Sequence, residues 1–168
     1  YRKIKSIQSE DMTVSLAYAT DYGMKYSGMR WYITNLIEEL DIPGEWYVDR
    51  DTMMLYFYPP EDFGTDSVFE ISTTETPLIS MKGAKNMTFN GFNIFGGKDS
   101  AIYAEDVENI TFSGLDIEAC SGYGIQAGGG NITIKESKFH NIGSTAINIT
   151  NGGNRMTLTP SGNLICNN

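Results

Sequence analysis

The amino-acid sequence predicts an all-β fold in which a solenoid of stacked short strands follows a hairpin-rich segment. The stretch KNMTFNGFNIFGGK is followed by two similar stretches, ENITFSGLDIEACSG and GNITIKESKFHNIG. Their first asparagines, Asn86, Asn109 and Asn131, lie 23 and 22 residues apart, and each precedes an apolar residue, a Thr and another apolar residue. A partial fourth copy, GNLICNN, contains Asn163. Repetition at such a period is typical of solenoids, in which each copy forms one coil.

Composition and charge narrow the class of protein. The chain has 168 residues, 40% of them apolar, which is enough for a packed core, and no apolar run approaches the ~18 residues that span a membrane. Its 21 acidic and 12 basic residues give a net charge of −9, which opposes binding to nucleic acid. We therefore expect neither a nucleic-acid nor a membrane partner. No metal or other cofactor is expected either, because the sequence lacks metal-ligand clusters and phosphate-binding loops.

The first part of the N-terminal segment, residues 1–67, is expected to hold strands and one short helix. YRKIKSI and MTVSLAY are rich in strand-forming residues and flank the polar turn QSED, and a glycine-containing loop, YGMKYSG, follows. In NLIEELD, Asn35 stands three residues before Glu38 and apolar residues recur at helical spacing. This pattern predicts a short capped helix that ends at Pro43 and Gly44.

The stretch EWYVDRDTMMLYFYPP predicts an aromatic β-hairpin. Two arms alternate in hydrophobicity about a turn at residues 49–52, and two prolines stop the second arm. Its aromatic residues could form a face on which sugars stack, although packing across the strands is the commoner cause of such a pattern. These aromatic residues are Trp46, Tyr47, Tyr56 and Tyr58.

Residues 68–168 are expected to form three to four coils, because adding 22 or 23 aligns the copies into apolar columns. Strands with alternating apolar residues, separated by Gly, Asn and Ser turns, can stack in parallel about 4.8 Å apart and bury one face. We also expect Cys120 and Cys166 in the core. The predicted columns are Ile79, Ile102, Ile125 and Ile147; Met81, Ala104, Ala127 and Ile149; Met87, Ile110, Ile132 and Leu164; Phe89, Phe112, Ile134 and Cys166; and Ile94, Ile117 and Phe139.

Three short strands per coil, Asn at a fixed corner and glycine-rich bends resemble the right-handed parallel β-helix of pectate lyases and polygalacturonases. A leucine-rich repeat is the nearest competitor at this period, but its leucine consensus and helical stretch are absent. The resemblance implies that the Asn column, including Asn163, is an asparagine ladder of buried amides. Several of these residues also begin N-x-Thr sequons, which we attribute to the ladder because they recur at the coil period.

Three segments resemble one group of that superfamily more closely: NLIEELDIPGEWYVDRDTMMLYFYPP, TPLISMKGAKNMTFNGFNIFGG and GGNRMTLTPSGNLICNN. The group consists of bacterial β-helix proteins, secreted or surface-exposed, several of which are or are described as glycoside hydrolases acting on polysaccharides. The resemblance implies that this chain is an excised fragment, which in its parent continues through further coils. We therefore also expect self-association through the C-terminal coil.

The resemblance places a substrate groove over the strand that precedes the Asn corner, in SAIYAED, YGIQAGG and TAINITN. Alternation within these strands predicts that Tyr103, Gln126 and Asn148 point outward, one per coil. An aromatic ring and two amides can bind sugar ring faces and hydroxyls, although a solvated polar stack gives the same pattern. We expect Asp99 and Glu105 at the margins of this groove.

The same alternation predicts a shallow floor of small residues beneath the groove. Its expected members are Ala101, Gly124 and Ala146.

No pair of carboxyl groups with the spacing of a glycosidase is predicted on this groove. Such a pair lies about 5 to 5.5 Å apart in retaining enzymes and about 6.5 to 9.5 Å in inverting ones. Asp99 and Glu105 are six residues apart on one strand, or about 20 Å. Asp116 and Glu118 belong to another face, where Glu118 over His140 is the one acid–imidazole pair predicted, and a surface ion pair explains it. The catalytic residues therefore remain unassigned.

The sequence leaves three functions open. The first is a fragment of a secreted carbohydrate-active β-helix protein, with glycoside hydrolysis of a polysaccharide in the parent. The second is a noncatalytic β-helix that binds glycans or adheres at a cell surface. A polysaccharide lyase is a weaker third, because the groove offers no Lys or Arg as the base. In each case the expected partner is a poly- or oligosaccharide, and neutral glycans fit the acidic chain more simply than acidic ones.

Overall fold

The computed structural model describes residues 2–20, 23, 28 and 30–168, and it divides the chain into two compact units, residues 1–67 and 68–168. Apart from Gly23 and Gly28, the predicted YGMKYSG loop lies outside the described residues. None of the helices in the described ranges has the length and hydrophobicity needed to cross a membrane.

The first unit contains two antiparallel hairpins. Strand β1 (Ile4–Gln8) pairs with β2 (Thr13–Leu16), and β3 (Trp46–Asp49) pairs with β4 (Met54–Phe57), so both predicted hairpins are confirmed. The Asp49 carboxylate holds the second turn: it accepts hydrogen bonds from the Thr52 hydroxyl at 2.7 Å and from the Asp51 N–H at 2.9 Å. These bonds, that of Thr52 first, lower the pKa of Asp49.

The predicted capped helix is wrong in its type and its cap. The structure has only a 3₁₀ turn, η1 (Ile37–Glu39), which begins without a side-chain cap. Asn35 instead accepts a hydrogen bond from the Val48 N–H at 2.8 Å and donates one to the Val48 carbonyl at 3.0 Å. Its carboxamide thus serves the outer edge of β3, where backbone groups lack a strand partner, and so is not available as a cap.

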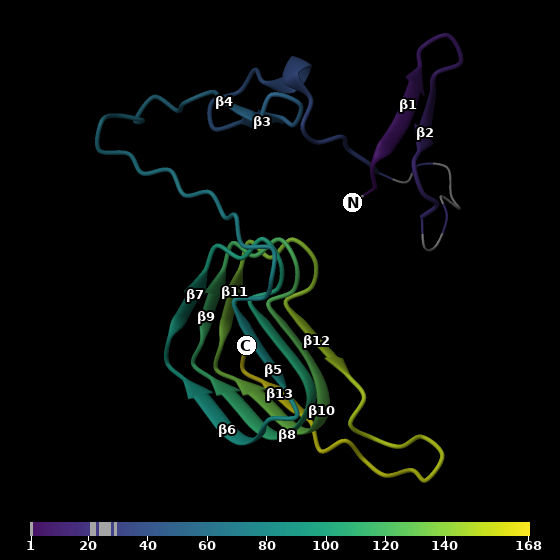
Figure 1. Ribbon diagram of the computed structural model, residues 1–168, viewed down its shortest axis with the longest axis vertical. Coiled ribbons are helices and arrows are strands. Elements are labelled where there is room, and N and C mark those ends of the chain that lie inside the picture. Colours follow the sequence, from purple (N-terminus) through teal and green to yellow (C-terminus); the bar gives the residue numbers. More distant parts are fainter. Residues whose placement is uncertain (1, 21–22, 24–27, 29) are drawn as a thin grey trace. The chain divides into compact units, whose positions relative to one another are not determined.

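The second unit is an all-β solenoid of about three turns, whose strands pair in parallel with their copies in the next coil (Figure 1). One sheet has the order β12-β10-β8-β5, with β6 also paired to β8 and β13 to β10, and the other has the order β11-β9-β7. The predicted parallel coils are confirmed. The strands are β5 (Ile79–Lys82), β6 (Lys85–Asn90), β7 (Asn93–Phe95), β8 (Ile102–Ser113), β9 (Asp116–Glu118), β10 (Ile125–Lys135), β11 (Lys138–His140), β12 (Ile147–Thr150) and β13 (Leu164–Cys166).

The core consists of most of the predicted columns, stacked in register through β5 to β12, whereas Met87 and Leu164 of the third column are exposed. Ile125 pairs with Ile102 on one side and with Ile147 on the other, and Phe89 stacks on Phe112 with ring centroids 5.3 Å apart. Alternate residues of each strand point inward, so a spacing of 22 or 23 residues superimposes like on like. The largest fully buried apolar side chains are Ile102, Ile110, Phe112, Leu115, Ile117, Ile125, Ile132 and Ile134.

The last coil is displaced by one residue from the predicted register. Leu164 pairs with Thr133 rather than with Ile132, so the offset there is 31 residues instead of 32. As a result Cys166 stacks on the outward position Lys135 and is only partly buried, which corrects its placement in the core. Cys120 is buried as predicted, and burial raises the pKa of its thiol.

The asparagine column differs from the buried ladder that the resemblance implies. Asn86, Asn109 and Asn131 are exposed, and all three have left-handed backbone, with φ of 56°, 56° and 55°. Asn109 donates an amide hydrogen bond to Asn86 at 2.6 Å. Because the coil turns sharply here, the corner requires a residue that tolerates positive φ, which Asn and Gly do. Gly162, with φ of 69°, lies over Asn131 and is the fourth member in place of Asn163.

Candidate functional site

The predicted groove residues lie in one row across the four-stranded part of the sheet. Backbone pairing aligns Ser80 with Tyr103, Tyr103 with Gln126, and Gln126 with Asn148. We call this row the outward face. Tyr103, Gln126 and Asn148 are each half-buried, so their rings and amides are partly accessible, and neighbouring members lie on strands about 4.8 Å apart.

The small residues expected as a floor belong to the interior instead. Ala101 is fully buried in the core, and a side-chain atom added to Gly124 would meet the ring of Phe139, which packs against that core. Inward–outward alternation starts only at Ile102, because residue 101 still lies in the bend before β8. The outward face is therefore a row on a sheet surface and has no recessed floor.

The two acidic residues expected at the margins have different surroundings. Glu105 accepts a hydrogen bond from Lys82 at 3.0 Å across neighbouring coils. This bond, followed by the charge of Glu105, raises the pKa of Lys82. Asp99 accepts a hydrogen bond from the hydroxyl of Ser100 at 3.3 Å, in the bend before β8. The two carboxylates stand at opposite ends of the strand segment that carries Tyr103, and they do not form a pair.

On the sheet β7-β9-β11 the predicted register is confirmed, but the predicted ion pair is wrong. Glu118 is aligned with His140, as expected. The imidazole Nε2 nevertheless lies 3.9 Å from the Asp116 carboxylate, and Glu118 accepts a hydrogen bond from Asn141 at 3.3 Å. A diagonal contact of this kind arises because side chains on one strand also reach neighbours two residues away on the next.

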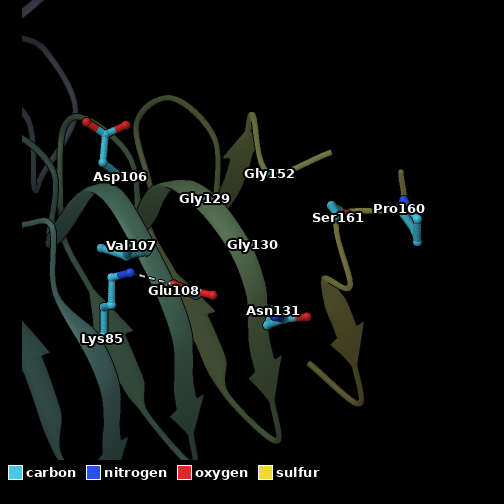
Figure 2. Close-up of a pocket in the computed structure, with 10 residues that line it drawn as sticks. All are labelled: Lys85, Asp106, Val107, Glu108, Gly129, Gly130, Asn131, Gly152, Pro160 and Ser161. Atoms are coloured by element: carbon cyan, nitrogen blue, oxygen red, sulfur yellow. Dashed lines mark hydrogen bonds and ion pairs between the residues drawn. The ribbon is translucent and has the colours of Figure 1, made fainter. Parts of the chain in front are cut away.

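The structure contains a hollow of about 380 Å³ that the sequence did not predict (Figure 2). It lies where the long strands β8 and β10 bend. The ion-paired residues Lys85 and Glu108 lie on one side, and the segment before β13 lies on the other (Figure 2). We call this feature the corner hollow. Its lining residues are Lys85, Asp106, Val107, Glu108, Gly129, Gly130, Asn131, Gly152, Pro160 and Ser161.

Charged and polar groups dominate the corner hollow. Lys85 donates a hydrogen bond to Glu108 at 2.7 Å, which raises the pKa of Lys85 and lowers that of Glu108. The lining contains one basic and two acidic residues, so its net charge is −1. Within the described residues, neither the Asp106 carboxylate nor the Asn131 carboxamide has a side-chain hydrogen bond. The charge of Asp106 acts on Lys82 of the preceding coil, and the carboxamide oxygen of Asn131 lies against Gly162.

Glycines allow three layers of backbone to meet beside the hollow. A side-chain carbon on Gly129 would overlap the Val107 carbonyl oxygen, and one on Gly152 would overlap the Gly129 carbonyl oxygen. Gly129 and Gly152 also have φ of 151° and 96°, which other residues rarely adopt. The sequence carries two signals of this feature: the GGG and GG runs, and the spacing of 31 residues from Asn131 to Gly162, which inserts a loop into the last coil.

The lining offers carboxylate, amide, ammonium and hydroxyl groups around one small space. Such a mixture of hydrogen-bond donors and acceptors suits a polyhydroxylated ligand, and the volume falls within the roughly 300–1,000 Å³ of small-ligand sites. No group of three or more His, Cys, Asp and Glu side chains among the described residues is arranged to hold a metal ion.

Comparison with known proteins identifies the family through the solenoid alone. Neither the curated proteins nor the solved structures gave a match. The model of the right-handed β-helix region matches residues 70–168, which is more than half of the chain and covers all the coils described above. The chain therefore belongs to the right-handed β-helix family.

Proposed function

We propose that this chain is the polysaccharide-binding part of a secreted or surface-exposed carbohydrate-active β-helix protein of bacteria. The observation that carries the proposal is the outward face, in which Tyr103, Gln126 and Asn148 follow one another at the strand spacing. A half-buried tyrosine ring supplies a rigid apolar surface for a sugar ring, and carboxamides both donate to and accept from hydroxyls. A repeating ligand matches a repeating surface, because each coil can offer one contact to each unit.

Glycoside hydrolysis is proposed only for a longer protein of which this chain is a part. A hydrolase needs two carboxyl groups within about 10 Å of each other across the scissile bond. Glu105 lies near the outward face but is hydrogen-bonded to Lys82, and Asp99 lies at the far end of the same strand segment. The outward face is thus proposed to supply contacts for binding rather than an acid and its partner.

A noncatalytic glycan-binding or adhesive β-helix is the second candidate, and it is favoured because Asp99 and Glu105 do not form a pair on the outward face. A polysaccharide lyase is favoured less. Lys82 is the basic side chain beside the outward face, and its hydrogen bond to Glu105 raises its pKa. A raised pKa keeps the ammonium protonated, which opposes the role of a proton-abstracting base.

Calorimetric titration with neutral hexasaccharides of glucose, mannose and xylose tests the binding proposal. Tyr103→Ala should weaken binding about three- to tenfold, since an aromatic contact contributes about 0.5–1.5 kcal/mol. Thr111→Ala is the matched control, because Thr111 is a half-buried residue of the same strand β8 in the row of Thr88 and Thr133. Equal affinities for Tyr103→Ala and Thr111→Ala would contradict the proposal, and so would the absence of binding to every hexasaccharide.

A further inference from the structure

The sheet β7-β9-β11 ends at β7, whose outer edge has no strand partner among the described residues (Figure 1). The carbonyl of Phe92 and the N–H of Gly96 both bond to β9, so these two residues turn their backbone groups inward, towards the sheet. Backbone groups point alternately to the two edges of a strand, and those of Asn93 and Phe95 therefore face the open edge. An edge of this kind is a template for another strand.

Residues 69–72, which we call the edge segment, repeat the sequence of β7 one coil earlier. The coil step of 23 residues aligns FEI at 69–71 with FNI at 92–94 and with LDI at 115–117. Phe69 and Ile71 thus correspond to Phe92 and Ile94, and Ile94 belongs to the core while Phe92 packs against it. The edge segment nevertheless forms no strand in the structure, and Ile71 is 67% exposed.

The chain that follows the edge segment already lies in this register. Glu75 accepts a hydrogen bond at 2.7 Å from Lys98, which stands 23 residues later. Glu75 comes three residues after the end of the edge segment, and Lys98 comes three residues after the end of β7, so the segment could lie over β7 without any change of chain length. The hydroxyl of Ser72 is buried without a hydrogen-bond partner in the described chain, which makes the present position of the segment costly.

Thr73 opposes the pairing of the edge segment with β7. The corner that follows each strand of this sheet is left-handed, with φ of 78° at Gly96, 55° at Ala119 and 52° at Asn141. Thr73 occupies the same place one coil earlier, but its backbone is not left-handed in the structure. A positive φ is uncommon for any residue with a side chain and exceptional for a β-branched one. The edge segment thus has the apolar residues of a strand and a corner residue that resists the strand position.

We propose that the edge segment is a detachable strand that pairs in parallel with β7, and that Thr73 sets the balance between its attached and detached forms. The attached strand would extend the inward columns of β7 by one coil, and its carbonyls would accept hydrogen bonds from the N–H groups of Asn93 and Phe95. The detached strand leaves β7 open to a strand of another chain. The proposal does not depend on glycan binding, because β7 and the outward face belong to different sheets.

Hydrogen exchange followed by NMR tests the proposal at the amides of Asn93 and Phe95. Thr73→Gly removes the resistance to a left-handed corner, so it should slow the exchange of both amides about tenfold relative to the wild type. Thr74→Gly is the matched control, because Gly97, which has its place in the next coil, is not left-handed. It should leave the exchange of both amides unchanged.

Ile71→Asp added to Thr73→Gly should restore the faster exchange, because the attached strand would then bury a charge without a partner. The amide of Ile94 faces β9 and should exchange slowly in every variant, which shows that β7 itself stays folded. Equal exchange rates in Thr73→Gly and Thr74→Gly would overturn the proposal, and so would slow exchange that survives Ile71→Asp. Protection that increases with protein concentration would also overturn it, because a strand of a second copy would then cover the edge.

Discussion

Replacing Ile125 by Asp should unfold the solenoid or leave it marginally stable. Ile125 is fully buried and stands between Ile102 and Ile147 in the central column. The substitution removes about 1.5–3 kcal/mol of apolar burial and adds several kcal/mol for a buried carboxylate without a partner. The sum is comparable with the whole stability of an ordinary domain, about 5–15 kcal/mol.

Urea unfolding followed by circular dichroism measures this loss. Gln126→Asp is the matched control, because it introduces the same residue one position later on the outward side of the same strand, where surface substitutions change stability by about 0.5 kcal/mol or less. Burial would raise the pKa of the new carboxyl in Ile125→Asp. The deficit should therefore shrink as the pH falls below the folded-state pKa, and it should be smallest below the unfolded-state pKa of about 3.9, where the carboxyl is protonated in both states.

The reasoning would be refuted if Ile125→Asp and Gln126→Asp unfolded at the same urea concentration at pH 7. That result would mean that residue 125 does not point inward, and because side chains alternate along a strand, the register of the whole coil would be wrong.

Three further predictions concern the corner, pH and the last coil. Gly152→Ala should lower the free energy of unfolding in urea by at least about 1–3 kcal/mol because of backbone strain, and by more because the new side chain overlaps Gly129. Gly64→Ala should be nearly neutral in the same assay, because Gly64 faces open space and its φ lies outside the left-handed region. The hydrogen bond from Lys85 lowers the pKa of Glu108, so the ion pair stabilises the fold above pH 4.5, and this effect is lost as the pH falls through the folded-state pKa of Glu108. The melting temperatures of the wild type and of Glu108→Gln should therefore converge in acid. We also propose self-association through the last coil, where Ile165 is 51% exposed. Sedimentation should show concentration-dependent dimers, and Ile165→Lys should abolish them. A monomer at all concentrations would contradict this proposal.

The inward columns could be predicted because strand alternation and a constant coil length together fix which residues stack. Ile102, Ile125 and Ile147 follow from Ile79 by successive steps of 23, 23 and 22 residues. The last coil could not be aligned in the same way, because its inserted loop removes the constant spacing. The residue that tolerates the left-handed corner there is Gly162, which looks nothing like the Asn of the earlier copies.

Side-chain partners were less predictable than register. The position of Asn35 suits a helix cap, yet its carboxamide pairs with the edge of β3, a competition that local sequence does not decide. The alignment of Glu118 with His140 was correct, but the imidazole lies nearer to Asp116, since long side chains choose among several neighbours. The corner hollow was missed because it depends on how the segment before β13 returns to the coil, which is a long-range property of the fold.

Chemical-shift mapping tests binding on the outward face most directly. In a titration of the labelled chain with the tightest-binding neutral hexasaccharide, the largest changes should fall on backbone amides of Tyr103, Gln126 and Asn148 and their immediate neighbours. Because these residues lie on three different coils, such a pattern arises only if the ligand lies across the strands. Changes confined to the Trp46–Phe57 hairpin, or to the sheet β7-β9-β11, would contradict the account and place the glycan there instead.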